Sequence, residues 1–372
     1  MTGVKFLDLG AQYASIRQEI DEAVLKVLAS STYVLGPEVE AFEQRFAKAH
    51  GADEGIAVSS GTSALHLALL AAGVSAGDEV IAPSMTFTAT AAAISYTGAR
   101  PVFVDVDPTS FTIDPAQIEA KITARTRAIV PVHLYGQSAD MRPIMEIAER
   151  RGLIVIEDAA QAHLAQYERR PVGSIGHIGC FSFYPGKNLG AYGEGGLATT
   201  SDSQFAHKMR LLRDWGQSRK YHHEFLAYNY RMDAIQGAVL GVKLRHLEAW
   251  TEARRAHARR YQDLLDGSSV RVATEVPGRR HVYHIFSVFH PERDRLRDEL
   301  GRQGIQTGIH YPIPVHLQGA YRELGYKPGD FPVTERIANE QLSLPMFAEL
   351  TEEEVVRVSD AVNAFAEAVP AA

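Results

Sequence analysis

Short apolar runs alternate with amphipathic runs between about residues 55 and 200. The apolar runs are residues 55–59, 79–83, 101–106, 127–133, 153–157 and 178–183. Several of them are continuously apolar, which is typical of strands that are covered on both faces. Between them, residues 62–72 and 140–151 repeat apolar side chains at helical spacing. This alternation predicts an α/β domain with a mostly parallel sheet.

A different pattern begins in the second half of the chain. Asp233 and Gln236 have the spacing of a helix-capping pair, and the apolar stripe that follows them predicts one long helix bridging two domains. Beyond it we expect a strand at 282–289, a helix at 292–303 and a strand at 304–310. Since 372 residues exceed what one core usually covers, we predict a large α/β domain over 1–245 and a small α+β domain over 246–372.

Composition narrows the class of protein. The 45% hydrophobic and 22% charged residues are typical of a globular protein. No apolar run approaches the roughly 18 residues that a membrane crossing requires, and the first residues lack the pattern of a secretion signal. A net charge of −7 without a basic block argues against nucleic acid and acidic membrane surfaces as partners. The single cysteine, Cys180, excludes an internal disulfide, and we expect a cytoplasmic protein.

The first predicted strand is followed by a candidate anion site. Ser60-Gly61-Thr62-Ser63 opens a helix, where free backbone N–H groups and the helix dipole favour a negative charge. The hydroxyl groups of Thr62 and Ser63 add two donors. An ordinary helix cap with a glycine turn explains the same residues equally well.

Two charged residues follow later strands. Asp158 ends the apolar run 153–157, where a carboxylate is able to hold a protonated ring nitrogen. Lys187 comes shortly after the run 178–183, among Phe, Tyr and Pro side chains that disfavour its charged form and make the amine nucleophilic. Ser182, five residues earlier, is within reach of a phosphate. Taken one at a time, each charged group also fits a plain solvated side chain.

In combination and in this order, these residues resemble the fold-type-I enzymes of pyridoxal phosphate (PLP), and among them the DegT/DnrJ/EryC1/StrS sugar aminotransferases. The matching stretches run nearly end to end: Gly36-Pro37-Glu38-Val39, Ser60-Gly61-Thr62-Ser63-Ala64-Leu65, Pro83-Ser84-Met85-Thr86-Phe87, Glu157-Asp158-Ala159-Ala160-Gln161, Phe181-Ser182 through Lys187-Asn188, Gly193-Glu194-Gly195-Gly196, Tyr228-Asn229-Tyr230-Arg231-Met232 and Gly308-Ile309-His310-Tyr311-Pro312. The resemblance implies an aspartate aminotransferase-like, three-layer sandwich with a mostly parallel central sheet and a smaller C-terminal α+β domain.

The resemblance also implies a cofactor and its contacts. The cofactor would be PLP, with pyridoxamine phosphate as the form that carries the amino group. Lys187 would hold it as a Schiff base and Asp158 would pair with its ring nitrogen, the two being the catalytic residues. The remaining cofactor contacts would be Gly61, Thr62, Ser63 and Ser182 at the phosphate, Phe87 stacked on the ring, and Gln161 at the ring hydroxyl. Asn229 would reach the phosphate in the partner subunit, so that a homodimer with shared active sites is expected.

The substrates follow from the same resemblance. Relatives move an amino group from L-glutamate to a ketosugar linked to a nucleotide diphosphate, and blocks 220–224 and 310–316 look most like those of enzymes that aminate C3 of dTDP- or UDP-linked sugars. The expected substrate contacts are Tyr184, Lys220, His310 and Tyr311. Amination at C4 and a cyclitol substrate stay open, and no residue clearly binds the carboxylates of glutamate.

Other functions compete with this one. Related dehydratases carry histidine in place of the Schiff-base lysine, so Lys187 argues against that branch. Asp105-Val106-Asp107 has the spacing of a divalent-ion site in a glycosyltransferase, although Pro108 favours a strand-terminating turn. His222-His223 is a weak zinc pair, and no metal is expected. A non-catalytic relative that only binds PLP is the last alternative.

Overall fold

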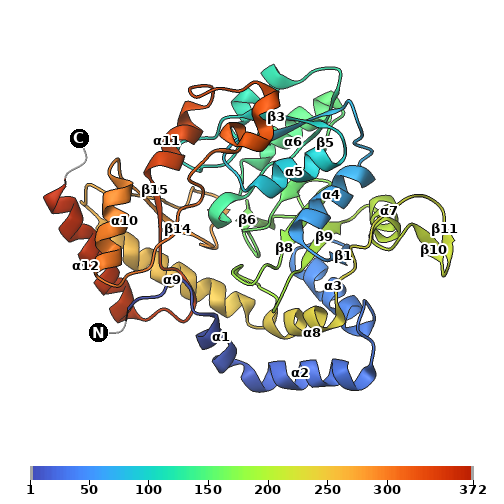
Figure 1. The fold of residues 1–372 in the computed structure, drawn as a ribbon, viewed down its shortest axis with the longest axis horizontal. Helices are drawn as coiled ribbons and strands as arrows, with labels where there is room; N and C mark the ends of the chain where they lie inside the picture. The colour runs from blue at the N-terminus through green and yellow to red at the C-terminus, as the bar shows by residue number, and fades with distance from the viewer. Residues whose placement is uncertain (1–2, 370–372) are drawn as a thin grey trace.

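The computed structural model describes residues 3–369, and a seven-stranded sheet forms the centre of its larger part (Figure 1). The strands are β1 (Glu54–Val58), β2 (Glu79–Pro83), β3 (Arg100–Val104), β4 (Thr126–Ile129), β5 (Ile154–Asp158), β8 (Ile178–Ser182) and β9 (Gly196–Thr200). Their order is β1-β9-β8-β5-β4-β2-β3, and β9 alone in this sheet runs against its neighbours. The carboxyl ends of the other six strands therefore share one edge.

Helices cover both faces of this sheet. The twelve described helices are α1 (Leu9–Ser15), α2 (Arg17–Ser30), α3 (Pro37–Ala49), α4 (Gly61–Ala71), α5 (Thr88–Tyr96), α6 (Met141–Arg151), α7 (Ser203–Arg213), α8 (Ala234–Lys243), α9 (Leu247–Leu265), α10 (Arg293–Arg302), α11 (Pro332–Glu340) and α12 (Glu352–Ala368). Buried side chains of α3, α6 and α8 pack with Val155 of β5, whereas those of α4, α5 and α7 pack with its neighbour Ile156. Alternation along each strand thus builds two cores, and the predicted three-layer sandwich is confirmed.

A smaller α+β part follows. Its sheet has the order β12-β14-β15, formed by β12 (Arg271–Val272), β14 (Phe286–Phe289) and β15 (Gln341–Leu344). Residues of α9, α10 and α12 share a core with this sheet, and Val4, which bridges to Ile305, is part of the same core. The N-terminal segment thus packs with the C-terminal part of the chain, while the expected boundary between residues 245 and 246 stays a prediction.

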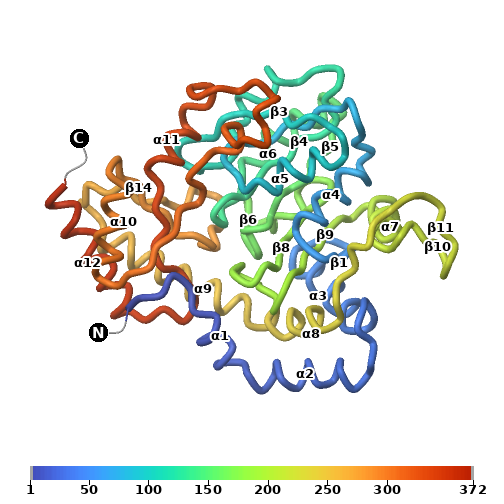
Figure 2. Tube along the Cα trace, viewed as in Figure 1, coloured from blue at the N-terminus to red at the C-terminus, as the bar shows by residue number. Residues whose placement is uncertain are grey.

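The fold also contains two further small sheets. One joins β6 (Gln166–Tyr167), β7 (Arg170–Pro171) and β13 (Arg279–Arg280), and the other is the hairpin of β10 (Gln217–Arg219) and β11 (His222–His223). The hairpin projects from the right-hand side of the molecule in Figure 2, away from the small sheet. Within residues 3–369, no helix combines the length and the apolar character needed to cross a membrane.

Two expectations about regular structure are wrong. The long helix from Asp233 is divided into α8 and α9 by a turn at residues 244–246, and side chains from both helices contribute to the cluster around α2 and to the larger core. The Asp233 side chain makes no capping bond, and Gln236 instead accepts a hydrogen bond from the backbone N–H of Tyr192. Residues 304–310 form no strand, because Ile305 and Gly308 bridge to different segments.

Candidate active site

A cavity of about 620 Å³ opens between the large sheet and the small α+β part. Its walls come from the start of α4, the β2–α5 connection, the end of β5, the segment after β8, and residues 284–285 and 310–311. This is the edge at which six strands end, which is where ligands bind in sheets of this type. Of the residues singled out from the sequence, those that line it are Gly61, Thr62, Phe87, Asp158, Gln161, Ser182, Tyr184, Lys187, His310 and Tyr311.

The start of α4 lies tightly against the end of β8. A Cβ atom on Gly61 would lie 2.6 Å from the Cβ of Ser182, so only glycine permits this approach. Ser60 caps the helix by accepting the N–H of Ser63 at 3.1 Å. The Ser63 hydroxyl bonds to the hydroxyls of Ser59 and Ser60, and Ser63 does not line the cavity. The hydroxyl residues that line it at this corner are Ser60, Thr62 and Ser182.

Lys187 presents a free amine to the cavity. Its backbone N–H donates to the carbonyl of Tyr184 at 2.8 Å, which folds the segment after β8 back toward the sheet. Its ε-amino group makes no hydrogen bond with any described residue. Burial lowers the pKa of this amine to about 8, although the charge of Asp158 opposes the shift. At pH 7 about a tenth of Lys187 is therefore the neutral, nucleophilic amine, far more than of an exposed lysine.

Asp158 is the buried acid of the site. Its Oδ2 accepts the hydroxyl of Thr90 at 2.7 Å, and its Oδ1 accepts the N–H of Ala160 at 3.2 Å. Burial raises the pKa of Asp158, while the Thr90 and Ala160 donors and the charge of Lys187 act in the opposite direction. Each oxygen keeps acceptor capacity on the cavity side, which suits a donor such as a protonated ring nitrogen.

Gln161, Tyr311 and Phe87 shape the cavity between these two groups. Gln161 accepts the N–H of Tyr135 at 2.7 Å and donates to the Tyr311 hydroxyl at 3.0 Å, so that its amide is fixed at both ends. The rings of Phe87 and Tyr311 lie 5.5 Å apart. Phe87 is 53% exposed, and it is thus a cavity wall and not a core residue in a helix–sheet seam.

The two histidines of the cavity are neutral. Burial and the nearby Lys187 lower the pKa of His310 to about 4, and burial lowers the pKa of His284 well below its usual value. His310 also bonds through Nδ1 to the Ser343 hydroxyl at 2.8 Å. Both rings consequently offer hydrogen bonds without positive charge at neutral pH.

Lys220 and Asn229 are not brought to this cavity within the chain. Lys220 is exposed in the β10–β11 hairpin, with its amine 5.3 Å from the ring of Tyr221. Asn229 is exposed beyond the hairpin, and its side-chain oxygen accepts from Arg231 Nε at 3.0 Å. Neither residue lines the cavity of its own subunit.

Several lining residues were given no individual role from the sequence, although some of them lie in the matching stretches: Phe6, Leu7, Ser60, Leu65, Thr86, Ala89, Val132, Ala160, Gly186, Glu194, His284, Ile285 and Met346. His284 carried the clearest signal, since it is a polar residue inside an apolar run. Phe6 and Met346 carried none, because single apolar residues far apart in the sequence do not reveal that they share a cavity.

The other candidate sites have ordinary structural explanations. Asp105 accepts the N–H groups of Val333 and Thr334 at the start of α11, and Asp107 accepts two N–H groups of the turn that follows it. No group of three His, Cys, Asp or Glu side chains among residues 3–369 is arranged to bind a metal ion. Cys180 is buried, and burial raises its pKa, so it is no nucleophile.

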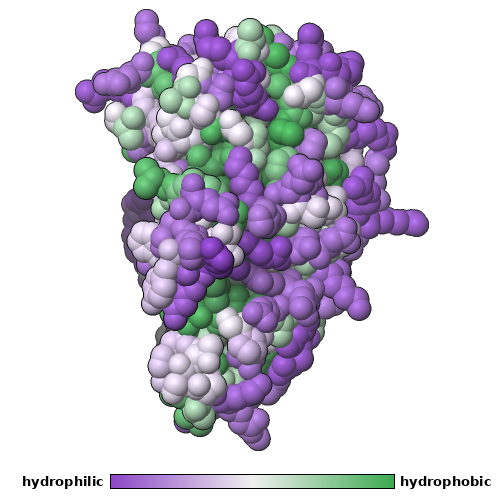
Figure 3. Space-filling model, turned by 90° about the vertical axis from the view of Figure 1, so that its right-hand side faces the viewer, coloured by the Kyte–Doolittle hydropathy of each residue, from purple (hydrophilic) through white to green (hydrophobic). Residues whose placement is uncertain are grey.

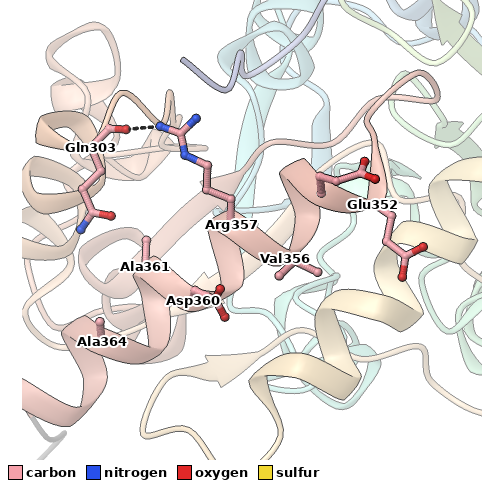
Figure 4. A pocket seen from close by; sticks show the side chains of 8 residues that line it. Gln303, Glu352, Val356, Arg357, Asp360, Ala361 and Ala364 are labelled. Atoms are coloured by element: carbon pink, nitrogen blue, oxygen red, sulfur yellow. Dashed lines mark hydrogen bonds between the residues drawn. The ribbon is translucent and has the colours of Figure 1, made fainter. Parts of the chain in front are cut away.

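A second hollow lies on the surface of α12 (Figure 4). Arg357 points from this helix to the carbonyl of Gln303, to which it donates at 2.6 Å, and Glu352 and Asp360 flank it. This hollow combines neither a free amine nor a buried acid, so the cavity of Lys187 is the candidate active site.

The polar groups of that cavity fit a flat aromatic aldehyde that carries a phosphate and a ring nitrogen. A helix start and two hydroxyl groups suit the phosphate, Asp158 suits the nitrogen, and the free amine of Lys187 suits the aldehyde. The half-exposed ring of Phe87 offers a face for stacking.

Comparison with known proteins gives a family match and close relatives. The profile of the DegT/DnrJ/EryC1/StrS aminotransferase family matches residues 14–363. A pleiotropic regulatory protein of Geobacillus stearothermophilus is 49% identical, with 97% of this chain and 98% of the relative covered. The dTDP-3-amino-3,4,6-trideoxy-α-D-glucose transaminase of Streptomyces venezuelae is 45% identical, covering 98% and 97%. A UDP-N-acetyl-3-dehydro-α-D-glucosamine 3-aminotransferase of Acidithiobacillus ferrooxidans is 44% identical, covering 97% and 98%.

Solved structures give the same result. S. venezuelae DesV, in complex with a ketimine intermediate, superposes with a TM-score of 0.97 at 45% identity and covers 99% of both chains. NtdA of Bacillus subtilis with bound pyridoxamine phosphate superposes with a TM-score of 0.92 at 31% identity, covering 99% of this chain and 86% of NtdA.

Proposed function

The chain belongs to the DegT/DnrJ/EryC1/StrS aminotransferase family, and on that premise we propose that it transfers the amino group of L-glutamate to C3 of a dTDP- or UDP-linked deoxy-ketosugar. It is a PLP-dependent aminotransferase with the aspartate aminotransferase-like fold. The choice of C3 is supported by the two relatives named above for 3-amino sugars, one linked to dTDP and the other to UDP. The proposed role is thus a step in deoxysugar biosynthesis.

One observation carries this proposal: a buried lysine with a lowered pKa and a buried acid line one cavity. Lys187 would bind the cofactor through its ε-amino nitrogen, and that same nitrogen would take the proton from the carbon of the amino donor. Asp158 would accept a hydrogen bond from the protonated ring nitrogen and hold that proton in place. When bound, PLP supplies the electron sink for the charge that develops as the proton leaves.

The remaining cofactor contacts are part of the same proposal, and the geometry of the cavity supports them. Thr62, Ser182 and the backbone N–H groups at the start of α4 would bind the phosphate, with Gly61 making room for it and Ser63 holding the helix cap. Phe87 would cover one face of the ring, and Gln161 would meet its hydroxyl side.

The sugar would be bound by uncharged groups. Tyr184, His310 and Tyr311 line the cavity and offer hydroxyl and neutral imidazole groups, which match the hydroxyl groups of a hexose. Burial raises the pKa of Tyr311, so its hydroxyl keeps its proton at neutral pH.

A homodimer with shared sites would complete the cavity. Among the described lining residues Lys187 is the sole cation at neutral pH, yet the ligands bring a phosphate, a diphosphate and two carboxylates. The side of the molecule that bears the hairpin shows apolar areas among polar ones (Figure 3), and its exposed rings and Leu226, which is 99% exposed, suit burial against another chain. Lys220 and Asn229 would then serve the partner's diphosphate and phosphate. The single buried cysteine supports a reducing cytoplasm as the place of action.

The alternatives are amination at C4, a cyclitol substrate, and an inert PLP binder, the last being raised by the regulatory name of the Geobacillus relative. A metal-dependent glycosyltransferase has no support, because the carboxylates of Asp105 and Asp107 accept hydrogen bonds from backbone N–H groups.

The test is a pair of half-reactions. The PLP-loaded enzyme is mixed first with L-glutamate alone and then with dTDP- or UDP-linked 3-keto and 4-keto sugars, and NMR locates the new amine. We expect one 2-oxoglutarate per site and an amine at C3. Cofactor retained without 2-oxoglutarate would mean an inert binder, and an amine at C4 would refute the assignment of the carbon. Lys48→Ala, an exposed lysine, is the control for Lys187→Ala.

A further inference from the structure

Two buried threonine hydroxyls lead from the cavity to the acid of the site. Thr86 Oγ1 lies 2.8 Å from Thr90 Oγ1, and Thr90 Oγ1 lies 2.7 Å from Asp158 Oδ2. Thr86 is 4% exposed and Thr90 is 1% exposed, so neither hydroxyl has bulk water as an alternative partner. These hydrogen bonds join the first turn of α5 to the end of β5.

The Asp158 carboxylate determines which hydroxyl donates in each of these two hydrogen bonds. An ionised carboxylate only accepts, so Thr90 spends its single proton on Asp158. The contact between the two hydroxyls then requires Thr86 to donate to Thr90. Thr90 lies in the first turn of α5, which no helical turn precedes, and its hydroxyl donates across to the end of β5.

We propose that Thr90 is a positioning residue, which fixes the Asp158 carboxylate in the orientation that leaves its free lone pairs facing the ring nitrogen of the cofactor. Ala160 holds the other oxygen by its N–H, so the carboxylate is clamped from both sides. The inference rests on the proposed function, since it assigns the ring nitrogen as the partner of Asp158.

A structural role alone predicts something different. If the hydroxyl of Thr90 only filled space, valine, which has nearly the same shape, would replace it without effect on the acid. If it only held α5 to β5, its loss would weaken every ligand of the cavity to the same degree. Action through Asp158 weakens only a ligand that has a ring nitrogen.

The experiment is a binding cycle on the apoenzyme. Thr90→Val removes the hydroxyl, Thr90→Ser keeps it, and Thr97→Val makes the same change at a partly buried threonine after α5 whose hydroxyl bonds to Ile94. The ligands are PLP and its 1-deaza analogue, in which carbon replaces the ring nitrogen. Dissociation constants are measured by protein fluorescence, without any turnover.

We expect Thr90→Val to bind PLP about tenfold more weakly, the loss of one hydrogen bond to a charged group. Its affinity for the deaza analogue should stay within about twofold of that of the wild type. Thr90→Ser and Thr97→Val should match the wild type for both ligands. Equal losses for both ligands would overturn the proposal, as would unchanged binding of PLP.

The pH dependence of binding gives a second readout. The charged or titratable groups that face Asp158 are Lys187, His133, Cys180 and Tyr311, and all of them stay in place in these variants. The Thr90 hydroxyl lowers the pKa of Asp158, so its removal raises that pKa, and the acid limb of PLP binding should move to higher pH. An acid limb that stays where it is in the wild type would overturn the proposal. Normal PLP binding without sugar amination would instead refute the proposed function alone.

Discussion

Lys187 and Asp158 face one cavity, and each charge favours the ionised form of the other. The carboxylate raises the pKa of the amine, the amine lowers the pKa of the carboxylate, and burial opposes both effects. Asp158 ends β5, and Lys187 lies in the segment after β8, the strand that pairs in parallel with β5. Their coupling makes the site sensitive to substitution of either residue.

Lys187→Ala should lose covalent attachment of PLP and on the order of 10³-fold or more of the aminotransferase rate, because it removes the amine that we propose binds the cofactor and moves the proton. Borohydride reduction followed by peptide mass spectrometry should place the label of the wild-type protein on the peptide with residue 187. Label on another lysine would contradict the assignment, and Lys48→Ala should behave as the wild type.

Asp158→Asn should lower the pKa of Lys187 below about 8, because the charge that supports the ammonium form is removed. The measurement is the pH dependence of the acylation rate of Lys187 in the apoenzyme, whose midpoint should shift to lower pH. Asp53→Asn, at an exposed acid whose carboxylate makes no hydrogen bond or ion pair with a described residue, should leave the midpoint in place. A shift to higher pH would contradict the coupling.

Glu157→Gln should lower the free energy of unfolding by about 3–5 kcal/mol. The buried Glu157 carboxylate accepts from His133 Nε2 at 2.9 Å and from the backbone N–H groups of Gly173, Ile175 and Gly176, and an amide cannot accept from all four. Denaturant unfolding of the variant is compared with that of Glu149→Gln, an exposed acid, which should match the wild type. Equal stability of both variants would refute the role of the carboxylate.

Lys243→Met should change how stability depends on pH. Lys243 is fully buried and donates to the Gly190 carbonyl at 2.7 Å, and burial lowers its pKa to about 8 from 10.5. Between pH 8 and 10.5 the unfolded chain holds this proton and the folded chain does not, so folding gains stability as pH rises. The variant should lack about 2–3 kcal/mol of that rise in apoenzyme unfolding. A rise as large as that of the wild type would contradict the prediction.

Asn229→Ala should lower PLP retention through the neighbouring subunit. Mixing this variant with Lys187→Ala should restore about a quarter of the wild-type activity, because half of the random dimers contain one intact site. Each variant alone, measured at low PLP, is the control. Absence of any recovery would contradict shared active sites.

The sequence predicted the sheet best where runs were short, apolar and bounded by turns. Strand β2 has the predicted bounds, and five others agree within a few residues at their ends. The sequence also predicted that Gly61, Asp158 and Lys187 lie near one another, because the carboxyl ends of parallel strands share an edge, and all three line one cavity. Strand β9 was not predicted, since its Gly-Leu-Ala-Thr-Thr sequence lacks a continuous apolar run.

The features that the sequence did not predict depend on contacts between distant segments. The turn at residues 244–246 lies between apolar positions that continue on both sides of it, so a periodic pattern cannot reveal it. In the sequence Thr90 does not differ from any other threonine in a helix, and only the structure shows that its hydroxyl donates to Asp158. Lys220 and Asn229 stay predictions, since they lie outside the cavity of their own chain.

The cavity wall joins the two extremes of the polypeptide. Phe6 and Leu7 meet His310 and Met346 there, and Val4 is tied to Ile305. During synthesis, a ribosome that has released residues 3–200 has already exposed Lys187 and every strand of the large sheet, yet the enclosing wall waits for some 150 further residues. A chain stalled before Met346 would therefore leave this cavity open to water, and the enclosed binding site would be completed only late in synthesis.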